Sequence, residues 1–532
     1  MKLMSEALAH RRLRAPAQSG GKLVAPPMDD VGQMIEQNAA ITAASDYDVQ
    51  GRPLGKLAEQ ARDELVQAAW AYTRSYLDVP SPTGGQATRL ILAGHQPQLF
   101  HPGVWYKNFV LGAIAKRHDA VAVNLAIDSD TIKSAAVRVP SGTVATPIVQ
   151  SIAFDQQSAR IPYEARRVID PECFGSFGRR VADAISELVP DPFVRAFWPL
   201  VEQRAEACGN LGQCIAQARH IQESRWGGTT LEIPQSHVCD LPAFHWFACH
   251  LLARLPQLWD VYNRSVSDFR RANHVRSSAH PVPDLSVDGD WLEAPFWIWD
   301  VDDPNRRRLF ARSSGDAIEL SDLESFTHRL PLTPDGDAAR AADELAELSG
   351  RGVRIRTRAL ITTLFARVCL GDLFLHGIGG AKYDQVTDAI IERFFGIKPP
   401  QYMTVTATLR LPVAQAGATH DDARQVSAAL RDLAFHPERS VQANGDTTLE
   451  SLLEQKRRWV ATPQTADNAR QRCHQIRDAN EGLQPFLADE RKALLAQQAA
   501  IETGLRNQGI LASRDYAFCL YPEASLRQLM QV

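Results

Sequence analysis

The stretch that decides the fold is residues 90–111, LILAGHQPQLFHPGVWYKNFVL, in a chain of 532 residues. It begins as an apolar run, passes through a turn of Gly, His, Gln and Pro, and continues as an amphipathic segment. The pattern predicts a short buried strand at 88–93 and a helix at 104–117. Such strand–loop–helix units bind nucleotides and other anions in α/β folds, because the free N–H groups of the helix point at the loop.

A second apolar run, AVAVNLAID at 120–128, predicts a buried parallel strand, so the first two strands and their helix form a βαβ unit. This rhythm stops near residue 156 and returns at residue 354. The later half predicts a helix, a strand, a second helix and an extended run at 357–369, 372–377, 385–395 and 402–412. We therefore predict an α/β protein whose Rossmann-like parallel-sheet core is split by a large, mostly helical insertion.

Shifts in composition divide the chain into an N-terminal arm with one helix, the first half of the core, the insertion, the second half of the core, a helical region, and a final strand with a cap. The expected boundaries are 1–85, 86–155, 156–353, 354–415, 416–510 and 511–532. The insertion should carry a helical cluster and one Trp-rich hairpin, since WIWDVDDPNRRRLF places a turn between two extended segments. Leu487, Leu494 and Ile501 fall seven apart, which indicates a helical hairpin of coiled-coil type or a helix along the domain's own surface.

The composition is that of an ordinary globular protein, with 45% hydrophobic residues and a formal net charge of −4. This charge gives no reason to expect nucleic acid or a membrane surface as a partner. No apolar run approaches the ~20 residues that a membrane span requires, and the N-terminus lacks the apolar core of a signal peptide. The eight cysteines contain no CxxC pair and several lie in apolar runs, which predicts reduced, buried thiols in a cytoplasmic protein.

The first candidate constellation lies at the first strand–helix junction and comprises His95, Gln96, His101, Lys107 and Asn108. Imidazole, amide and ammonium groups near a helix N-terminus can donate hydrogen bonds to phosphate or carboxylate oxygens. The structural alternative is that the histidine and glutamine side chains only satisfy backbone groups of the loop.

The second candidate is the Gly-rich turn HGIGGAKYD at 376–384. Gly379 and Gly380 allow a ligand to approach the backbone closely, and Lys382 supplies a charge that can meet a phosphate. His376 precedes this turn, while Asp384 could accept from a ribose hydroxyl or cap the following helix. The turn matches neither GxxxxGK[ST] nor GxGxxG, so both of those nucleotide motifs are excluded.

The third candidate is the pair Asp128 and Asp130 at the end of the second strand. Two carboxylates at this spacing could hold a metal, act as a general base, or orient an amine, and hydrogen bonds within the loop are the structural alternative. No HxH or HExxH spacing accompanies them, so we assign no metal ligands. The arginine clusters at 351–358 and 306–308 could grip a carboxylate or phosphate, but solvated faces are the expectation for such runs.

Taken together, GHQPQLFHPGVWYKNF, the AIDSD strand end and LFLHGIGGAKYDQVTDAIIERFFGI resemble the BshC family, the cysteine-adding enzymes of bacillithiol synthesis. The resemblance covers about 88–150 and 355–412 and, more loosely, the helical tail. It implies a core related to nucleotidyltransferases, with His95, Gln96 and His101 at the phosphate side. Gly379, Gly380 and Asp384 would lie at the adenosine side. The sequence departs from the family at Lys382, where the family has an acidic residue.

The expected function is a BshC-like ligase or transferase that joins a carboxylate, with cysteine as one candidate, to an amine-bearing small molecule. Its ligand, with ATP or ADP as the candidate cofactor, would bind between the 94–103 and 376–384 loops. His95 and His101 would stabilise developing negative charge, and Asp128 or Asp130 would orient or deprotonate the amine. One alternative is a non-catalytic ligand-binding or scaffold protein that forms a homodimer through its helical tail. The other is a metal-dependent hydrolase that uses the same His and Asp residues.

Overall fold

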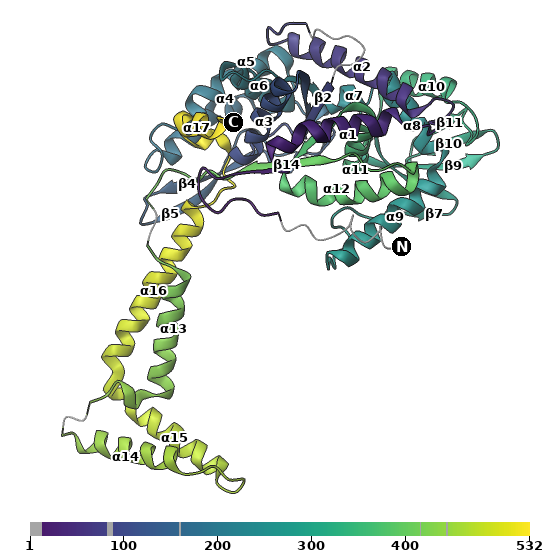
Figure 1. Ribbon diagram of the computed structural model, residues 1–532. Helices are drawn as coiled ribbons and strands as arrows, with labels where there is room; N and C mark the ends of the chain where they lie inside the picture. Colours follow the sequence, from purple (N-terminus) through teal and green to yellow (C-terminus); the bar gives the residue numbers. More distant parts are fainter. Residues whose placement is uncertain (1–12, 82–88, 159–160, 415–416, 443–444) are drawn as a thin grey trace. The chain divides into compact units, whose positions relative to one another are not determined.

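A computed structural model describes residues 13–81, 89–158, 161–414, 417–442 and 445–532 (Figure 1). The described residues belong to two compact units. Unit 1 contains the mixed α/β part of the protein, and unit 2 is mostly helical. The boundaries of unit 1 are Met1–Val139, Gln150–Arg410 and Arg514–Val532, and those of unit 2 are Pro140–Val149 and Leu411–Ser513.

The centre of unit 1 is a six-stranded sheet with the strand order β1-β14-β13-β2-β3-β6. All neighbouring strands in it are parallel except β1, which pairs with β14 in the antiparallel direction. Its strands are β1 (Lys22–Ala25), β2 (Arg89–His95), β3 (Ala120–Ala126), β6 (Leu231–Pro234), β13 (Leu373–His376) and β14 (Tyr402–Ala407). The apolar runs at 90–93 and 122–126 form strands of a largely parallel sheet because helices cover such a sheet on both faces. The prediction of a mixed α/β protein with a parallel sheet is confirmed.

The strand order reverses between β2 and β13. Helix α3 (Pro102–Arg117) connects β2 to β3, which is the next strand toward one edge of the sheet. Helix α12 (Ile378–Ile390) connects β13 to β14, which is the next strand toward the opposite edge. Because β2 and β13 pair in parallel, with Ala93 opposite Leu375, the loops that follow them emerge at the same edge of the sheet. In open α/β sheets this reversal point is where ligands bind.

The helices of unit 1 follow the predicted periodicity in most places. Residues 242–272 form two helices, α8 (Pro242–Ala253) and α9 (Leu255–Ala272), because Pro256 in the first turn of α9 starts a new helix after a non-helical Arg254. The other helices of four or more residues are α1 (Val31–Ala43), α2 (Leu54–Arg74), α4 (Pro171–Ile185), α5 (Val194–Cys208), α6 (Leu211–Arg225), α7 (Gln235–Val238), α10 (Ala339–Gly350), α11 (Ala359–Phe365) and α17 (Glu523–Met530). Two π-helical turns, Ala366–Leu370 and Ile391–Phe395, continue α11 and α12.

A second sheet has the order β11-β10-β9-β8-β12, with β7 also paired to β8. Its antiparallel β8–β9 pair, in which Trp297 lies opposite Arg308, confirms the predicted Trp-rich hairpin, although the sheet is larger than one hairpin. Its strands are β7 (Val287–Asp288), β8 (Trp291–Asp300), β9 (Arg307–Ser314), β10 (Ala317–Ser321), β11 (Thr327–Leu330) and β12 (Val353–Thr357). Strands β4 (Ala136–Gly142) and β5 (Pro147–Ala153) form a separate two-stranded sheet.

Three sequence-based expectations about elements are corrected. The region expected to be a separate helical insertion contributes β6 to the edge of the central sheet, and the N-terminal arm contributes β1 to the opposite edge. The residues expected to form a final strand instead form a 3-10 turn, Phe518–Leu520, and α17. Strands β1 and β6 have four residues each, which is too short for an alternation of apolar and polar residues to be recognised in the sequence.

Unit 2 contains α13 (His420–Phe435), α14 (Thr447–Ala461), α15 (Ala469–Leu483) and α16 (Ala488–Leu511). Helix α13 packs along α16, and α14 packs along α15 (Figure 1). Leu487 is buried, and Leu494 and Ile501 are half-buried on one stripe of α16, as the seven-residue spacing predicted. Among the helices that the structure describes, none is long and apolar enough to cross a membrane.

Candidate functional site

His95 is the last residue of β2, and both of its ring nitrogens are engaged within the protein. Nδ1 lies 3.1 Å from the carbonyl oxygen of Gln96, which can only accept, so Nδ1 carries the proton. Nε2 then accepts from the Asn108 side-chain amide at 3.2 Å. Burial, with Arg219 and Lys107 nearby, lowers the pKa of His95 well below its usual range. His95 is therefore a neutral imidazole that fixes the start of the loop.

Lys107 and Asn108 point from α3 back to the end of β2. The Lys107 ammonium donates to the carbonyl oxygen of Gly94 at 2.6 Å, and burial together with Arg219 lowers its pKa to about 7. The Asn108 amide donates to Glu223 Oε1 at 2.8 Å. Both residues, expected as ligand-binding groups, are buried and hold the loop in place.

Behind this loop lies a buried ionic network that the sequence did not reveal. Arg219 of α6 bonds both Glu223 of the same helix and Glu232 of β6. Trp105 Nε1 also donates to Glu223, at 2.6 Å, and Asn124 donates to Glu232 at 2.7 Å. The spacing of four between Arg219 and Glu223 is a helix-pair signal that could have been noticed, but the partner on β6 had none.

The more exposed part of the strand end is formed by Gln96 and Asp130, which are half-buried. Gln96 Nε2 donates to Asp130 Oδ2 at 3.3 Å. Arg306 donates to the carbonyl oxygen of Ser129 at 2.9 Å and forms a 3.4 Å ion pair with Asp130. Its guanidinium lies 4.5 Å from the ring centroid of Trp297. The β2 and β3 loops are therefore tied to the second sheet by an arginine.

Asp128 is buried and committed to a local contact. Its carboxylate accepts from the Ser236 backbone N–H at 2.8 Å and from the Ser236 hydroxyl at 2.5 Å. Burial raises the pKa of Asp128, although these hydrogen bonds oppose the shift. Both oxygens are thus directed at the start of α7, and Asp130 is the more accessible of the two aspartates that the sequence singled out.

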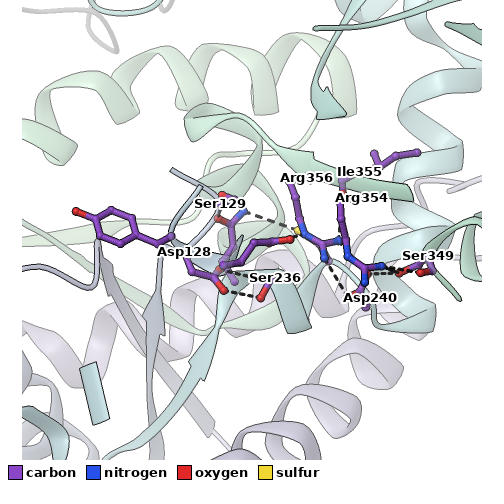
Figure 2. Close-up of polar contacts among 12 residues, drawn as sticks. Asp128, Ser129, Ser236, Asp240, Ser349, Arg354, Ile355 and Arg356 are labelled. Carbon is purple, nitrogen blue, oxygen red and sulfur yellow. Dashed lines mark hydrogen bonds and ion pairs between the residues drawn. The ribbon is translucent and has the colours of Figure 1, made fainter. Parts of the chain in front are cut away.

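The expectation of solvated faces is wrong for two of the clustered arginines. Arg356 is 2% exposed and binds Glu164 at 2.9 Å and Asp240 at 2.9 and 3.1 Å, whereas Arg351 is exposed as expected. Figure 2 shows the Arg356–Asp240 pair beside the Asp128–Ser236 contact. Arg358 is likewise buried and bonds Glu293. A buried guanidinium requires a carboxylate partner, and the partners of Arg356 and Arg358 lie on other segments of the chain. These arginines therefore link separate segments of the fold.

His101 begins α3. Its Nδ1 accepts from the Gly103 backbone N–H at 3.1 Å, so the imidazole is the N-cap of the helix. Burial, with Arg514 nearby, lowers its pKa to about 4. At neutral pH His101 is therefore an uncharged acceptor that occupies one of the free N–H groups of the α3 N-terminus.

His376, the last residue of β13, is hydrogen-bonded to Asp384, 2.9 Å from Nε2 to Oδ2. Arg367 donates to the same carboxylate oxygen at 2.6 Å and to Asp388 at 2.5 Å. Asp384 lies in the second turn of α12 and is buried, so it does not cap the helix; the N-cap is Gly377. The sequence found the histidine and the aspartate separately, but their pairing and Arg367 were missed.

The Gly-rich turn forms the first turn of α12. Gly377 makes no side-chain capping bond, and Gly379 and Gly380 are exposed. Lys382 is half-buried, and among the described residues no acceptor is hydrogen-bonded to its ammonium. This end of α12 therefore keeps free backbone donors and an unpaired positive charge.

Two hydrogen-bonded sets thus lie at the two strand ends. The predicted His95 and Asn108 form one with Glu223, which was not predicted, and the predicted His376 and Asp384 form the other with Arg367, which was not predicted. In the part of the chain that the structure describes, no cluster of three or more His, Cys, Asp or Glu side chains could hold a metal ion. No protein-family model matches the chain, and no curated protein matches it.

Proposed function

We propose that the protein is a ligase or transferase of the BshC type, with a Rossmann-like core, that joins a carboxylate to an amine-bearing small molecule. Cysteine is the first carboxylate to test, and ATP or ADP is the first nucleotide. The ligand would bind at the sheet edge between the loop after β2 and the Gly-rich turn after β13. The resemblance of the quoted motifs supports the choice of reaction.

One observation carries the location. The strand order reverses between β2 and β13, and these parallel neighbours send their following loops to the same edge. Two loops that are about 270 residues apart were identified from the sequence for their chemistry, and the fold places their strands side by side. The reversal point of an open parallel sheet separates the two flanking loops enough to admit a small ligand.

The predicted site residues divide into partly exposed groups that can reach a ligand and buried groups that cannot. Gln96, Asp130 and Lys382, with the exposed backbone of Gly379 and Gly380, are the groups that would touch a ligand. Lys382 and the free N–H groups of α12 would meet its phosphate or carboxylate oxygens. Asp130 would hold the ammonium of the amine substrate. The buried residues His95, Lys107, Asn108 and Asp128 would position these loops, since their polar atoms are already engaged.

The proposal includes a homodimer formed through unit 2. Among the described residues of that unit, five large apolar side chains are exposed: Ile148, Phe435, Val460, Phe486 and Leu495. The buried apolar cluster within this unit is small, comprising Leu449, Leu453 and Leu483, so exposed apolar side chains on its helices are candidates for burial against a protein partner. A second copy of the chain is the partner we propose.

Titration calorimetry with ATP and ADP tests the binding site. We expect Lys382→Ala to weaken nucleotide binding by about tenfold or more, because a charge-assisted hydrogen bond contributes about 1.5–3 kcal/mol. Lys116→Ala is the matched control, since Lys116 is exposed at the other end of α3, away from the carboxyl edge of the sheet. It should bind as the wild type does.

The reaction is tested by incubating the protein with ATP, cysteine and a panel of amino sugars, and measuring new amide products by mass spectrometry. Equal nucleotide affinity of the wild type and Lys382→Ala would refute the location of the site. Nucleotide binding without any amide product from a broad set of carboxylates and amines would refute the reaction.

A further inference from the structure

The two strand-end histidines differ in one respect. His95 and His376 are 6% and 5% exposed, and each closes a parallel strand of the central sheet. His95 uses both ring nitrogens within the protein. His376 uses only Nε2, which lies against Asp384. In the described part of the chain no group is hydrogen-bonded to Nδ1 of His376, and Nδ1 is not a fully buried atom.

The partners of Asp384 determine which nitrogen of His376 carries the proton. Burial alone would raise the pKa of Asp384, but the Arg367 guanidinium and then His376 outweigh it and hold the pKa well below its usual range. The carboxylate is thus an anion that can only accept, so Nε2 must be the donor. In the neutral ring this leaves a lone pair on Nδ1. An acidic group that fixes a tautomer in this way prepares a histidine for proton transfer.

The Gly-rich turn keeps the space at Nδ1 open. A Cβ on Gly380 would lie 2.7 Å from Nδ1, closer than real Cβ contacts allow, whereas a Cβ on Gly379 would meet nothing within 4 Å. Neither glycine has a positive φ, so backbone conformation does not require glycine at either position. Position 380 instead requires glycine because the imidazole of His376 leaves no room for a Cβ.

We propose that His376 is a catalytic residue, the proton acceptor of the ligation, and that Asp384 and Arg367 are its positioning residues. This inference rests on the proposed function. The carboxylate substrate is taken to be activated as a mixed anhydride with a phosphate of the nucleotide. The amine nitrogen forms the C–N bond to the acyl carbon, and the C–O bond to phosphate breaks with its electron pair. The proton lost by the nitrogen moves to Nδ1.

A purely structural role fits this geometry less well. A histidine that served only to hold α12 against β13 would gain from a second hydrogen bond, as His95 does with Asn108. Phe374 and Tyr402 already pack against the ring of His376, with centroids 4.5 and 5.1 Å away, so apolar packing fixes its orientation. The open nitrogen adds nothing to stability and is suited to a substrate proton.

Diethyl pyrocarbonate, which acylates accessible unprotonated imidazole nitrogens, tests the open Nδ1 without any assumption about substrate. We expect native His376 to be modified at least tenfold faster than His95, as measured by peptide mass spectrometry. Gly380→Ala should slow this modification at least tenfold, because its methyl group would press on Nδ1, and Gly379→Ala should not change it. A His376 as unreactive as His95, or one insensitive to Gly380→Ala, would overturn the inference.

Turnover is the second readout. We expect His376→Gln to retain the ATP-induced rise in melting temperature and to lose 100-fold or more in kcat, the scale of general base catalysis. Gly380→Ala should lower kcat in the same way. Unchanged kcat in either variant, or loss of nucleotide affinity in folded His376→Gln, counts against the proton-acceptor role. Failure of the proposed function is seen separately, in Lys382→Ala calorimetry and in the amide products of the wild type.

Discussion

At the scale of a single residue, His101 gives a pH dependence that can be measured. Its folded-state pKa of about 4 lies below the ~6.5 of an unfolded histidine. Between these values the unfolded chain binds more protons, so the free energy of unfolding falls as the pH drops from 6.5 to 4. The shift corresponds to at most about 3–4 kcal/mol, and solvent screening of this half-buried ring lowers that contribution.

His101→Asn separates the titration from the cap, because asparagine is a good N-cap and does not ionise. Urea unfolding at pH 4.5 and 7.5 should show a smaller loss of stability on acidification for His101→Asn than for the wild type. His101→Ala should be less stable than His101→Asn at both pH values by about 1 kcal/mol. Equal acid sensitivity of the wild type and His101→Asn would show that other groups dominate.

The same scale shows what sequence reasoning could find at the site. His95 and His376 were recognisable because a polar residue at the end of an apolar strand is conspicuous, and Asp384 because it ends the Gly-rich stretch. Arg367, which fixes Asp384, was hidden in the apolar run LFARVCLGDLF, where nothing local marks a buried charge. The sequence also could not tell an engaged imidazole from an open one, since that difference depends on Asn108 for His95 and on Gly380 for His376.

At the scale of elements, Arg219 links α6 to β6 through two buried carboxylates. Arg219→Met should lower the free energy of unfolding by about 3–5 kcal/mol, because Glu223 and Glu232 would stay buried without a counter-charge. Arg225→Met, at the exposed end of the same helix, should stay within about 0.5 kcal/mol of the wild type. Chemical denaturation measures both. A loss of less than 1 kcal/mol in Arg219→Met would mean that the two glutamates become protonated or hydrated at little cost.

Element prediction succeeded where apolar runs were long and failed where they were short or charged. The runs at 90–93 and 122–126 marked β2 and β3 because burial on both faces leaves little room for polar residues. By contrast, β12 reads VRIRT, and its arginines concealed a strand whose charges pair with distant carboxylates. The C-terminal aromatics suggested a strand, but Phe518 begins a 3-10 turn and packs on Trp105, with 4.4 Å between the ring centroids.

At the scale of the whole molecule, the proposed homodimer is testable on the intact protein. Leu495→Glu places a charge on the exposed apolar surface of α16 and should convert a dimer into a monomer in sedimentation equilibrium. Ala500→Glu is the control, because residue 500 is exposed on the same helix about 140° further round. It should leave the mass unchanged. A wild type that is monomeric at all concentrations would refute the dimer.

The C-terminal segment, Arg514–Val532, belongs to unit 1, which also contains the candidate site. The backbone N–H of Phe518 donates to the Phe100 carbonyl oxygen at 2.8 Å, and the Tyr521 hydroxyl donates to that of Leu409 at 3.1 Å. On the ribosome, at ~5–20 residues per second, roughly 20 to 80 s separate the synthesis of residue 100 from that of residue 518. During that interval the loop after β2 lacks its packing partner, so a nascent chain that stops before residue 514 would leave the Phe100 carbonyl oxygen and the Trp105 ring without their contacts to Phe518.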